Sequence, residues 1–212
     1  MSVSTHHVGW NPCWRVIPTK YAEKRVLGKL AIGKDLEAVE ELERMTSERL
    51  RKSRGAPGND YVMAAFSYRH PSRFSDGTYG VFYAAKTLET AIAEAKFHRQ
   101  AFMSATKEAP MRLEQRALTA ELDASLHDLR GKEEQYAHVY SKTSYTASQN
   151  LARELVEQSN GLVYDSVRDG GGECAAVFNP DAVGDCRPER SIVFEWDGKK
   201  IAMIYELHER RG

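Results

Sequence analysis

Hydrophobic and polar residues recur with two different periods along the chain, and these periods predict its strands and helices. Residues 80–85, GVFYAA, alternate like a strand, so that the side chains of Val, Tyr and the last Ala share one face. A helical pattern follows, for which Thr87 is a suitable N-cap. Glu94 lies on the shoulder of this helix, where it either reaches a cleft beside the strand or faces water. The apolar stripe of the helix contains Leu88, Ala91, Ile92, Ala95 and Phe102.

Most other segments show one period clearly, and one segment fits both. We predict helices at 34–52 and at 145–161, with Gly161 as the stop signal of the second. The dipeptide Asp197–Gly198 is a two-residue hairpin turn between two strands. The segment 111–131 is ambiguous, because RALTAEL alternates like a strand whereas its leucines recur like those of a helix. Further strands are predicted at 61–68, 162–168, 173–180, 191–196 and 199–207.

The order of these elements indicates the fold class. Strands and helices interleave in the first part of the chain and strands dominate its end, which predicts an α+β fold with a mixed sheet. With 212 residues, the chain is long enough for one large domain or two small ones. The Gly- and Pro-rich stretch 53–60 is better explained as a surface loop than as a domain boundary. We therefore predict a single domain over 1–212, with a helical insertion around 35–60.

Composition and charge narrow the classes of function. Thirty Lys and Arg balance thirty Asp and Glu, so the formal net charge does not favour binding to nucleic acid or to an anionic membrane. The start of the chain lacks the pattern of a signal peptide, and no apolar run approaches the roughly 20 residues that span a bilayer. Three cysteines without a CxxC pair argue against a disulfide scaffold or a structural zinc site. We expect a cytoplasmic protein with reduced thiols and without a metal site.

Standard signatures of nucleotide-binding loops, zinc proteases and serine hydrolases do not occur in the sequence. The glycines at 170–172 lie between two predicted strands and are explained as a flexible turn. Four other residues have the chemistry to cleave an N-glycosidic bond: an arginine for phosphate, a tyrosine for stacking, a carboxylate for an oxocarbenium-like centre and a serine for orientation. Each of them also has an ordinary structural explanation, and the pattern alone does not decide between a shared site and four separate structural roles. The four are Arg73, Tyr83, Glu94 and Ser166.

Three blocks of sequence, taken in order, resemble the RES domain family. They are WRVIPTKY, SRFSDGTYGVFYAAKTLETAIAEAKFH and GLVYDSVRDGGGECAAVF. Each block alone is a weak signal, but the three in this order are specific. The resemblance extends from about Trp14 to the hairpin at Asp197, which is nearly the whole chain. Many members carry a GRWN-like block, whereas this chain has Phe74 and Ser75 in place of Trp and Asn.

The resemblance implies a toxin of a bacterial type II toxin–antitoxin pair that consumes NAD. Members of the family cleave the nicotinamide–ribose bond by phosphorolysis or hydrolysis, and some transfer ADP-ribose to a protein. Their fold is similar to that of ADP-ribosylating toxins, which hold NAD in a cleft. Their usual partner is an Xre-like helix-turn-helix antitoxin that covers the active site. The expected substrate is therefore NAD, and the expected partners are this antitoxin and, for a transferase, a protein acceptor.

The resemblance also implies roles for individual residues. Arg73, Glu94 and Ser166 occupy the Arg, Glu and Ser positions for which the family is named. Arg73 would contact the NAD phosphates or ribose, and Tyr83 would pack against the nicotinamide end. Glu94 would stabilise the developing ribosyl cation, and Ser166 would fix the nicotinamide ribose or amide. Two further candidates for the NAD pocket are Arg15 and Asn150.

Three functions stay open at this point. They are NAD degradation with phosphate or water as acceptor, transfer of ADP-ribose from NAD to a protein, and a non-catalytic binding module or RNA-directed toxin. The first two share one pocket and one first step. The neutral charge and the sparse interleaving of aromatic and basic residues weaken the case for RNA.

Overall fold

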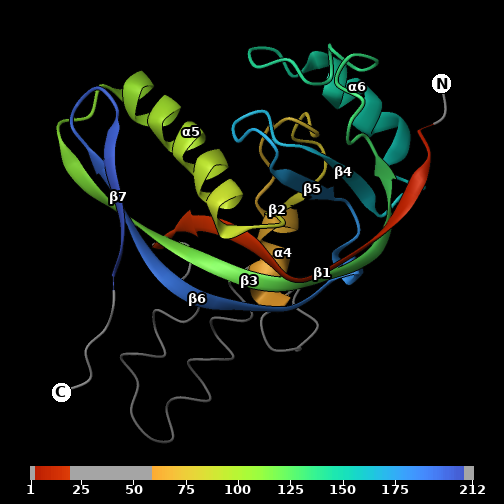
Figure 1. Cartoon of the computed structure of the whole chain (residues 1–212), viewed down its shortest axis with the longest axis horizontal. Coiled ribbons are helices and arrows are strands. Elements are labelled where there is room, and N and C mark those ends of the chain that lie inside the picture. The colour runs from red at the N-terminus through yellow and green to blue at the C-terminus, as the bar shows by residue number, and fades with distance from the viewer. Residues whose placement is uncertain (1–2, 20–58, 208–212) are drawn as a thin grey trace, which may run out of the picture.

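The computed structural model describes residues 3–19 and 59–207, which form a strongly curved sheet with helices packed on it (Figure 1). The predicted helix at 34–52, and most of the insertion around 35–60, lie outside the described residues. The α-helices are α4 (Asn59–Ser67), α5 (Leu88–Thr106) and α6 (Thr146–Leu155), and a short 3-10 helix covers Pro180–Ala182. The strands are β1 (Thr5–Pro18), β2 (Phe82–Ala85), β3 (Met111–Asp128), β4 (Gly161–Asp165), β5 (Glu173–Val177), β6 (Val183–Trp196) and β7 (Ile201–Leu207).

The long strand β1 closes part of the sheet into a circuit. It pairs with β2 through Trp14 and Ala85, and it pairs with β3 along most of its length. In addition, β2 pairs with β5, β5 with β4 and β4 with β3, so these five strands form a closed circuit. The strands β6 and β7 extend the sheet from β3. The pairing of β3 with β4 is parallel and the other pairings are antiparallel. The sheet is therefore mixed, and the predicted α+β class is confirmed.

The two faces of β2 pack against different layers. Phe82 and Ala84 point into the strand circuit, where they meet apolar residues of α4. Val81, Tyr83 and Ala85 point the other way, toward α6 and the start of α5, as the alternation predicted. A third apolar cluster runs along α5 from Leu88 to Met103 and joins the helix to β6 and β7. The side chain of Tyr83 therefore lies on the face of β2 that α5 and α6 cover.

Several other predictions from the pattern are confirmed. Thr87 is the N-cap of α5, and its Oγ1 accepts a hydrogen bond of 3.3 Å from the Thr90 N–H. The predicted hairpin joins β6 to β7, but its turn covers residues 197–200 rather than only Asp197 and Gly198. The predicted strands after α6 are all present, although β6 begins earlier, at Val183. The ambiguous segment 111–131 forms the strand β3. A spacing of four residues equals two strand periods. The strand thus buries the leucines that suggested a helix, including Leu118, Leu122 and Leu126.

Three predictions about elements are wrong. Residues 61–68, predicted as a strand, lie almost entirely in the helix α4, because its apolar positions recur with the helical period and pack on the core. The helix α6 ends at Leu155 rather than at Gly161, which begins β4 with φ of +147°. A Cβ at Gly161 would lie 2.2 Å from the Ala176 carbonyl oxygen, so this glycine permits close strand packing. Phe102, predicted in the buried stripe of α5, is 54% exposed.

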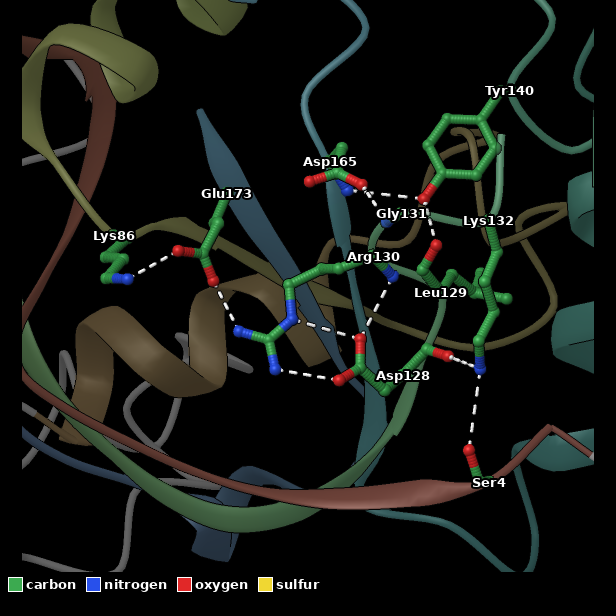
Figure 2. Close-up of polar contacts among 10 residues, drawn as sticks. All are labelled: Ser4, Lys86, Asp128, Leu129, Arg130, Gly131, Lys132, Tyr140, Asp165 and Glu173. Atoms are coloured by element: carbon green, nitrogen blue, oxygen red, sulfur yellow. Dashed lines mark hydrogen bonds and ion pairs between the residues drawn. The ribbon is translucent and has the colours of Figure 1, made fainter. Parts of the chain in front are cut away.

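A network of charges joins the ends of three strands beside the candidate site (Figure 2). Arg130, just after β3, donates from Nε and Nη2 to the Asp128 carboxylate at 3.0 and 2.8 Å. Its Nη1 donates to Glu173, the first residue of β5. Lys86, just after β2, binds the other carboxylate oxygen of Glu173. One arginine and one lysine therefore hold the ends of β2 and β3 and the start of β5 together.

Further hydrogen bonds extend this network to the end of β4 (Figure 2). The Gly131 N–H donates to the Asp165 carboxylate at 2.6 Å. The Asp165 N–H donates to the Tyr140 hydroxyl at 3.3 Å, and this hydroxyl donates to the Leu129 carbonyl at 2.7 Å. Burial raises the pKa of Tyr140, so its hydroxyl keeps the proton that it donates. The loop that begins after Asp165 therefore starts from a fixed point.

We expect Arg130→Met to lower the free energy of unfolding. The variant leaves two partly buried carboxylates, Asp128 and Glu173, without their shared cation. The expected loss is about 1–3 kcal/mol, between the values for exposed and fully buried ion pairs. Urea unfolding measures it, with Arg112→Met as the control, because Arg112 is 74% exposed in its pair with Glu195. Equal losses in the two variants would contradict a special contribution of the network.

The contribution of Arg130 should also depend on pH. The Arg130 hydrogen bond lowers the pKa of Asp128. Burial raises the pKa of Glu173, but its bonds to Lys86 and Arg130 outweigh burial and lower it. Carboxylates with lowered pKa values stabilise the folded state fully above their ordinary pKa of about 4, and lose this effect as the pH falls through the lowered values. Urea unfolding at several pH values should show a constant gap between the native protein and Arg130→Met near neutrality, which shrinks below about pH 4. A gap that widens in acid would refute this assignment.

Candidate active site

Glu94 and Ser166 meet in the structure, although they lie 72 residues apart in the sequence. Glu94 projects from α5, and Ser166 begins the loop between β4 and β5. The Ser166 Oγ donates a hydrogen bond of 2.6 Å to Glu94 Oε1. Because β2 and β5 pair in antiparallel fashion, the chain that leaves β2 toward α5 and the chain that enters β5 lie at the same edge. The strand pairing thus brings two of the predicted site residues into direct contact.

The protein uses all hydrogen-bonding positions of the Ser166 hydroxyl. It accepts bonds from the backbone N–H groups of Arg168 at 3.1 Å and Asp169 at 3.0 Å. A hydroxyl has two acceptor positions and one proton, so this proton is committed to Glu94. The thiol of Cys174, whose pKa is raised by burial, lies 4.0 Å from the same oxygen, Oε1. No described residue donates to Glu94 Oε2, which is therefore available to a ligand.

The loop 166–172 is held closely against the start of α5. Thr90 Oγ1 donates to Asp169 Oδ2 at 2.7 Å, and the Gly172 N–H donates to the Asp169 carbonyl at 3.1 Å. The Ser166 N–H donates to the Gly172 carbonyl at 2.7 Å. A Cβ at Gly172 would lie 2.5 Å from Thr90 Oγ1, so the close approach requires glycine. The predicted turn is present, with Gly171 at φ of +85°, and Gly172 has the further part of allowing the loop to pack on α5.

Tyr83 fixes the segment that carries Arg73. The Tyr83 hydroxyl lies 2.8 Å from Ser72 Oγ and accepts a bond of 2.9 Å from the Phe74 N–H, so it binds both neighbours of Arg73. Burial raises the pKa of Tyr83 to about 12, and its hydroxyl therefore stays protonated at neutral pH. From α6, Ser148 Oγ donates to the Arg73 carbonyl at 2.6 Å. The position of Arg73 is thus set by a strand on one side and a helix on the other.

The guanidinium group of Arg73 faces the loop before α6. The residue is 7% exposed, and its Nη1 donates to the carbonyls of Val139 at 2.9 Å and Ser141 at 3.0 Å. The group lies 4.7 Å from the centroid of the Tyr145 ring. These partners leave Nε and Nη2 without an acceptor among the described residues. Arg73 therefore holds this loop, and its predicted contact with NAD stays a prediction.

Arg168 and His98 belong to the electrostatic surroundings of Glu94. His98 is exposed at one edge, but its neighbours remove part of the water around the ring. This desolvation has the largest effect on the pKa of His98 and lowers it. Glu94 raises this pKa, whereas Arg168 and Arg73 lower it further. The three charged groups therefore all influence the pKa of one imidazole.

The structure directs Arg15 to the other face of the sheet. Its neighbour Trp14 pairs with Ala85, so alternation points the Arg15 side chain away from the face of the Tyr83 ring. The Arg15 Nη1 donates to the Tyr83 carbonyl at 2.9 Å, and its guanidinium lies 4.8 Å from the centroid of the Phe82 ring inside the strand circuit. Burial lowers the pKa of Arg15. Arg15 thus contacts β2 through the Tyr83 carbonyl and the Phe82 ring, on the face opposite to the Tyr83 side chain, and its role in NAD binding stays a prediction.

Asn150 also has partners away from Glu94. It is exposed on α6, where its Oδ1 accepts a bond of 3.0 Å from Arg153. Its neighbour Gln149 points toward the Arg73 segment and donates from Nε2 to the carbonyls of Ser72 at 2.9 Å and Ser75 at 3.1 Å. Gln149, rather than Asn150, is therefore the amide of α6 that supports the segment, and the role of Asn150 in NAD binding stays a prediction.

The comparison with known families concerns the part of the chain that contains this geometry. A sequence profile of the RES domain matches residues 49–197, more than half of the chain. The chain belongs to the RES domain family. This result confirms the resemblance that the three sequence blocks indicated, and the family supports the predicted class of toxin.

One relative extends the similarity beyond the bounds of the RES domain match. The chain is 27% identical over 208 residues to the uncharacterized protein y4oC of Sinorhizobium fredii (strain NBRC 101917 / NGR234). The alignment covers 92% of this chain and 87% of that protein. The two proteins are thus similar over nearly their whole lengths, and the name of the relative assigns no activity.

In this RES domain, the residues that replace the Trp and Asn of many members have structural partners. Phe74 is 1% exposed and packs edge-on against Tyr164, with ring centroids 4.9 Å apart. Ser75 Oγ donates to the Tyr79 carbonyl at 2.6 Å and accepts from the Gly77 N–H at 3.0 Å. Both residues therefore stabilise the local turn.

Sequence reasoning missed several residues around the Glu94–Ser166 pair and the Arg73 segment. Helical periodicity places Thr90 on the same side of α5 as Glu94 but did not reveal its bond to Asp169, and it could have found Phe97, about one turn after Glu94. The loop residues carry no periodic signal, because the path of the loop decides where they point. The missed residues are Phe97, Ser148, Gln149, Arg168, Asp169 and Cys174.

The described residues include neither a candidate membrane-spanning helix nor a candidate metal site. Within residues 3–19 and 59–207, no helix has both the length and the apolar composition needed to cross a membrane. The same ranges hold no group of three or more His, Cys, Asp or Glu side chains arranged to bind a metal ion. The three cysteines of the chain are buried and free: Cys13, Cys174 and Cys186.

We expect Gly172→Ala to destabilise the protein. The new Cβ would lie 2.5 Å from Thr90 Oγ1 and 2.7 Å from Asp169 Oδ2, so the loop must move away from α5. The expected loss is about 1–3 kcal/mol, as for other overpacked sites. Urea unfolding measures it against Gly170→Ala, whose added Cβ would meet no atom within 4 Å. A Gly172→Ala variant as stable as Gly170→Ala would contradict the close packing of the loop on α5.

Proposed function

We propose that this protein cleaves the nicotinamide–ribose bond of NAD and acts as the toxin of a toxin–antitoxin pair. Membership of the RES domain family supports the class of toxin. One feature of the site carries the proposed chemistry: Ser166 holds Glu94 Oε1 at 2.6 Å, while Oε2 has no donor among the described residues. A carboxylate that is fixed at one oxygen and available at the other is suited to stabilise a cationic sugar centre.

Glu94 acts electrostatically on the reacting carbon. The N-glycosidic bond of NAD breaks, and its electron pair moves to the pyridinium nitrogen, so that neutral nicotinamide leaves. The ribosyl C1′ becomes cationic in character, and the carboxylate of Glu94 stabilises this charge. Since Ser166 orients the carboxylate before the substrate binds, little reorganisation is needed as the charge develops.

Arg73 and Tyr83 contribute to binding in this proposal. Arg73 has Nη1 engaged with backbone carbonyls, and it offers Nε and Nη2 to a phosphate or ribose oxygen. Tyr83 uses its hydroxyl to fix the segment that carries Arg73, and it offers its ring to the nicotinamide end of the substrate. The substrate would thus be held at its phosphates and at its flat ring, with the bond to be cleaved between them.

The same first step serves two reactions. If phosphate or water attacks C1′, NAD is degraded, and if a protein side chain attacks it, ADP-ribose is transferred. Labelled NAD separates them, because degradation gives free ADP-ribose or its 1-phosphate, whereas transfer fixes the label on protein. As partner we propose an Xre-like helix-turn-helix antitoxin that blocks the site, so the assay uses protein purified free of it.

We expect Glu94→Gln to lower NAD consumption by at least about 100-fold, because a neutral amide does not replace the negative charge at the reacting carbon. The measurement is the release of nicotinamide from NAD by the purified protein. Glu89→Gln is the matched control, since Glu89 lies in the first turn of the same helix with an exposed side chain. We expect this control to keep its activity within about twofold of the native protein, as is usual for an exposed position.

The possible outcomes separate the parts of the proposal. Full activity of a folded Glu94→Gln variant would remove Glu94 from the mechanism. If the native protein leaves NAD unchanged, the enzymatic proposal fails, and a non-catalytic binding module becomes the better description.

A further inference from the structure

The arginines of the described residues differ in the kind of group that they bind. Arg73 and Arg168 have only backbone carbonyls and aromatic rings as partners. Within residues 3–19 and 59–207, no carboxylate forms an ion pair with either of them. A guanidinium group that is held in place without being neutralised is suited to bind an anion. The arginines that do form ion pairs with carboxylates include Arg112, Arg130, Arg153, Arg187 and Arg190.

The side chain of Arg168 is oriented by the protein. Its guanidinium carbon lies 3.3 Å from the centroid of the Phe97 ring on α5. Its Nη2 donates to the Lys142 carbonyl at 2.9 Å, and its backbone N–H donates to Ser166 Oγ at 3.1 Å. An arginine has five N–H donors, and this hydrogen bond engages one of them. The two hydrogens of Nη2 belong to the two bidentate edges of the guanidinium group, Nε with Nη2 and Nη1 with Nη2, so one of these edges stays available for a bidentate contact.

Arg73 and Arg168 bind adjacent points of the same loop. Arg73 donates to the Ser141 carbonyl, and Arg168 donates to the carbonyl of the next residue, Lys142. The two guanidinium groups therefore lie at one short stretch of backbone. A pair of cations in this arrangement matches the two linked phosphates of a nucleoside diphosphate. The Ser166 hydroxyl, which accepts the Arg168 N–H, connects this pair to Glu94.

We propose that Arg168 is a further substrate-binding residue, which binds the diphosphate of a nucleotide together with Arg73. This inference rests on the function proposed above, because it names the part of that substrate that Arg168 recognises. Arg168 donates to no oxygen of Glu94 in the structure, so its part is binding and not bond cleavage. The cationic edge of Arg168 would bind the phosphates, while Glu94 acts at the ribose.

Titration calorimetry with ADP-ribose tests the binding directly and requires no turnover. We expect Arg168→Gln to weaken ADP-ribose binding about 10- to 100-fold, the effect of losing hydrogen bonds to a charged group. Arg168→Lys keeps the charge but loses the bidentate edge, so an intermediate loss of about 10-fold is expected. Arg112→Gln is the matched control, because Arg112 binds the exposed side of β6 through Glu195, and we expect its affinity to be unchanged.

A kinetic comparison distinguishes binding of phosphate from support of the fold. Nicotinamide riboside contains the bond that is cleaved but no phosphate. We expect Arg168→Gln to raise the KM for NAD about 10- to 100-fold with kcat nearly unchanged. Its kcat/KM for nicotinamide riboside should equal that of the native protein. A variant that only distorted the site would lose activity on both substrates to the same extent.

Each outcome supports or overturns the assignment. Unchanged ADP-ribose affinity in Arg168→Gln, an equal loss on NAD and the riboside, or no ADP-ribose binding by the native protein would overturn it. If ADP-ribose binds in an Arg168-dependent way but NAD is not cleaved, the inference holds and the proposed catalytic function fails. If urea unfolding shows that Arg168→Gln is unfolded, Arg168→Lys decides: a loss of about 10-fold supports the inference, and unchanged affinity overturns it.

Discussion

The antiparallel pairing of β2 with β5 is the constraint on which the candidate site depends. It places Ala85 opposite Cys174, so that the chain leaving one strand and the chain entering the other meet at one edge of the sheet. The helix α5 starts at this edge and the loop 166–172 ends there, which is why Glu94 and Ser166 are in contact. The charges around Arg130 hold the neighbouring strand ends at the same edge (Figure 2). The carboxylate and the serine that orients it are therefore both attached to a rigid part of the sheet.

The way in which Glu94 is oriented bears on the chemistry proposed for it. An arginine could hold a carboxylate equally firmly, but it would neutralise the charge. Ser166 is a neutral donor, and two backbone N–H groups fill its acceptor positions, so that its proton points to Glu94 while the carboxylate keeps its charge. This arrangement needs the loop to lie close to α5. Gly172 permits that approach, because any larger residue would collide with Thr90.

The arginines near the candidate site differ in the groups that hold them. Arg130 is neutralised by Asp128 and Glu173, and its ion pairs join strand ends. Arg73 and Arg168, by contrast, are positioned by carbonyls and rings, which orient a guanidinium without cancelling its charge. Charges of both signs that are oriented but not neutralised thus surround one region, as expected for a site that binds an anionic ligand and stabilises a cationic centre.

The sequence by itself determined the features that depend on neighbours in the chain. It determined the alternation of β2, the N-cap of α5 and the last hairpin, because capping and side-chain period are local properties. It misread α4, because a short apolar run fits a strand as well as a helix. The family resemblance selected Arg73, Tyr83, Glu94 and Ser166, which the residue pattern alone left undecided. Only the tertiary structure decided that Ser166 orients Glu94 and that Arg15 faces the other side of the sheet. It also decided that Arg168 lies at the site. These contacts depend on the order of the strands and on the path of a loop, which no local pattern in the sequence reveals.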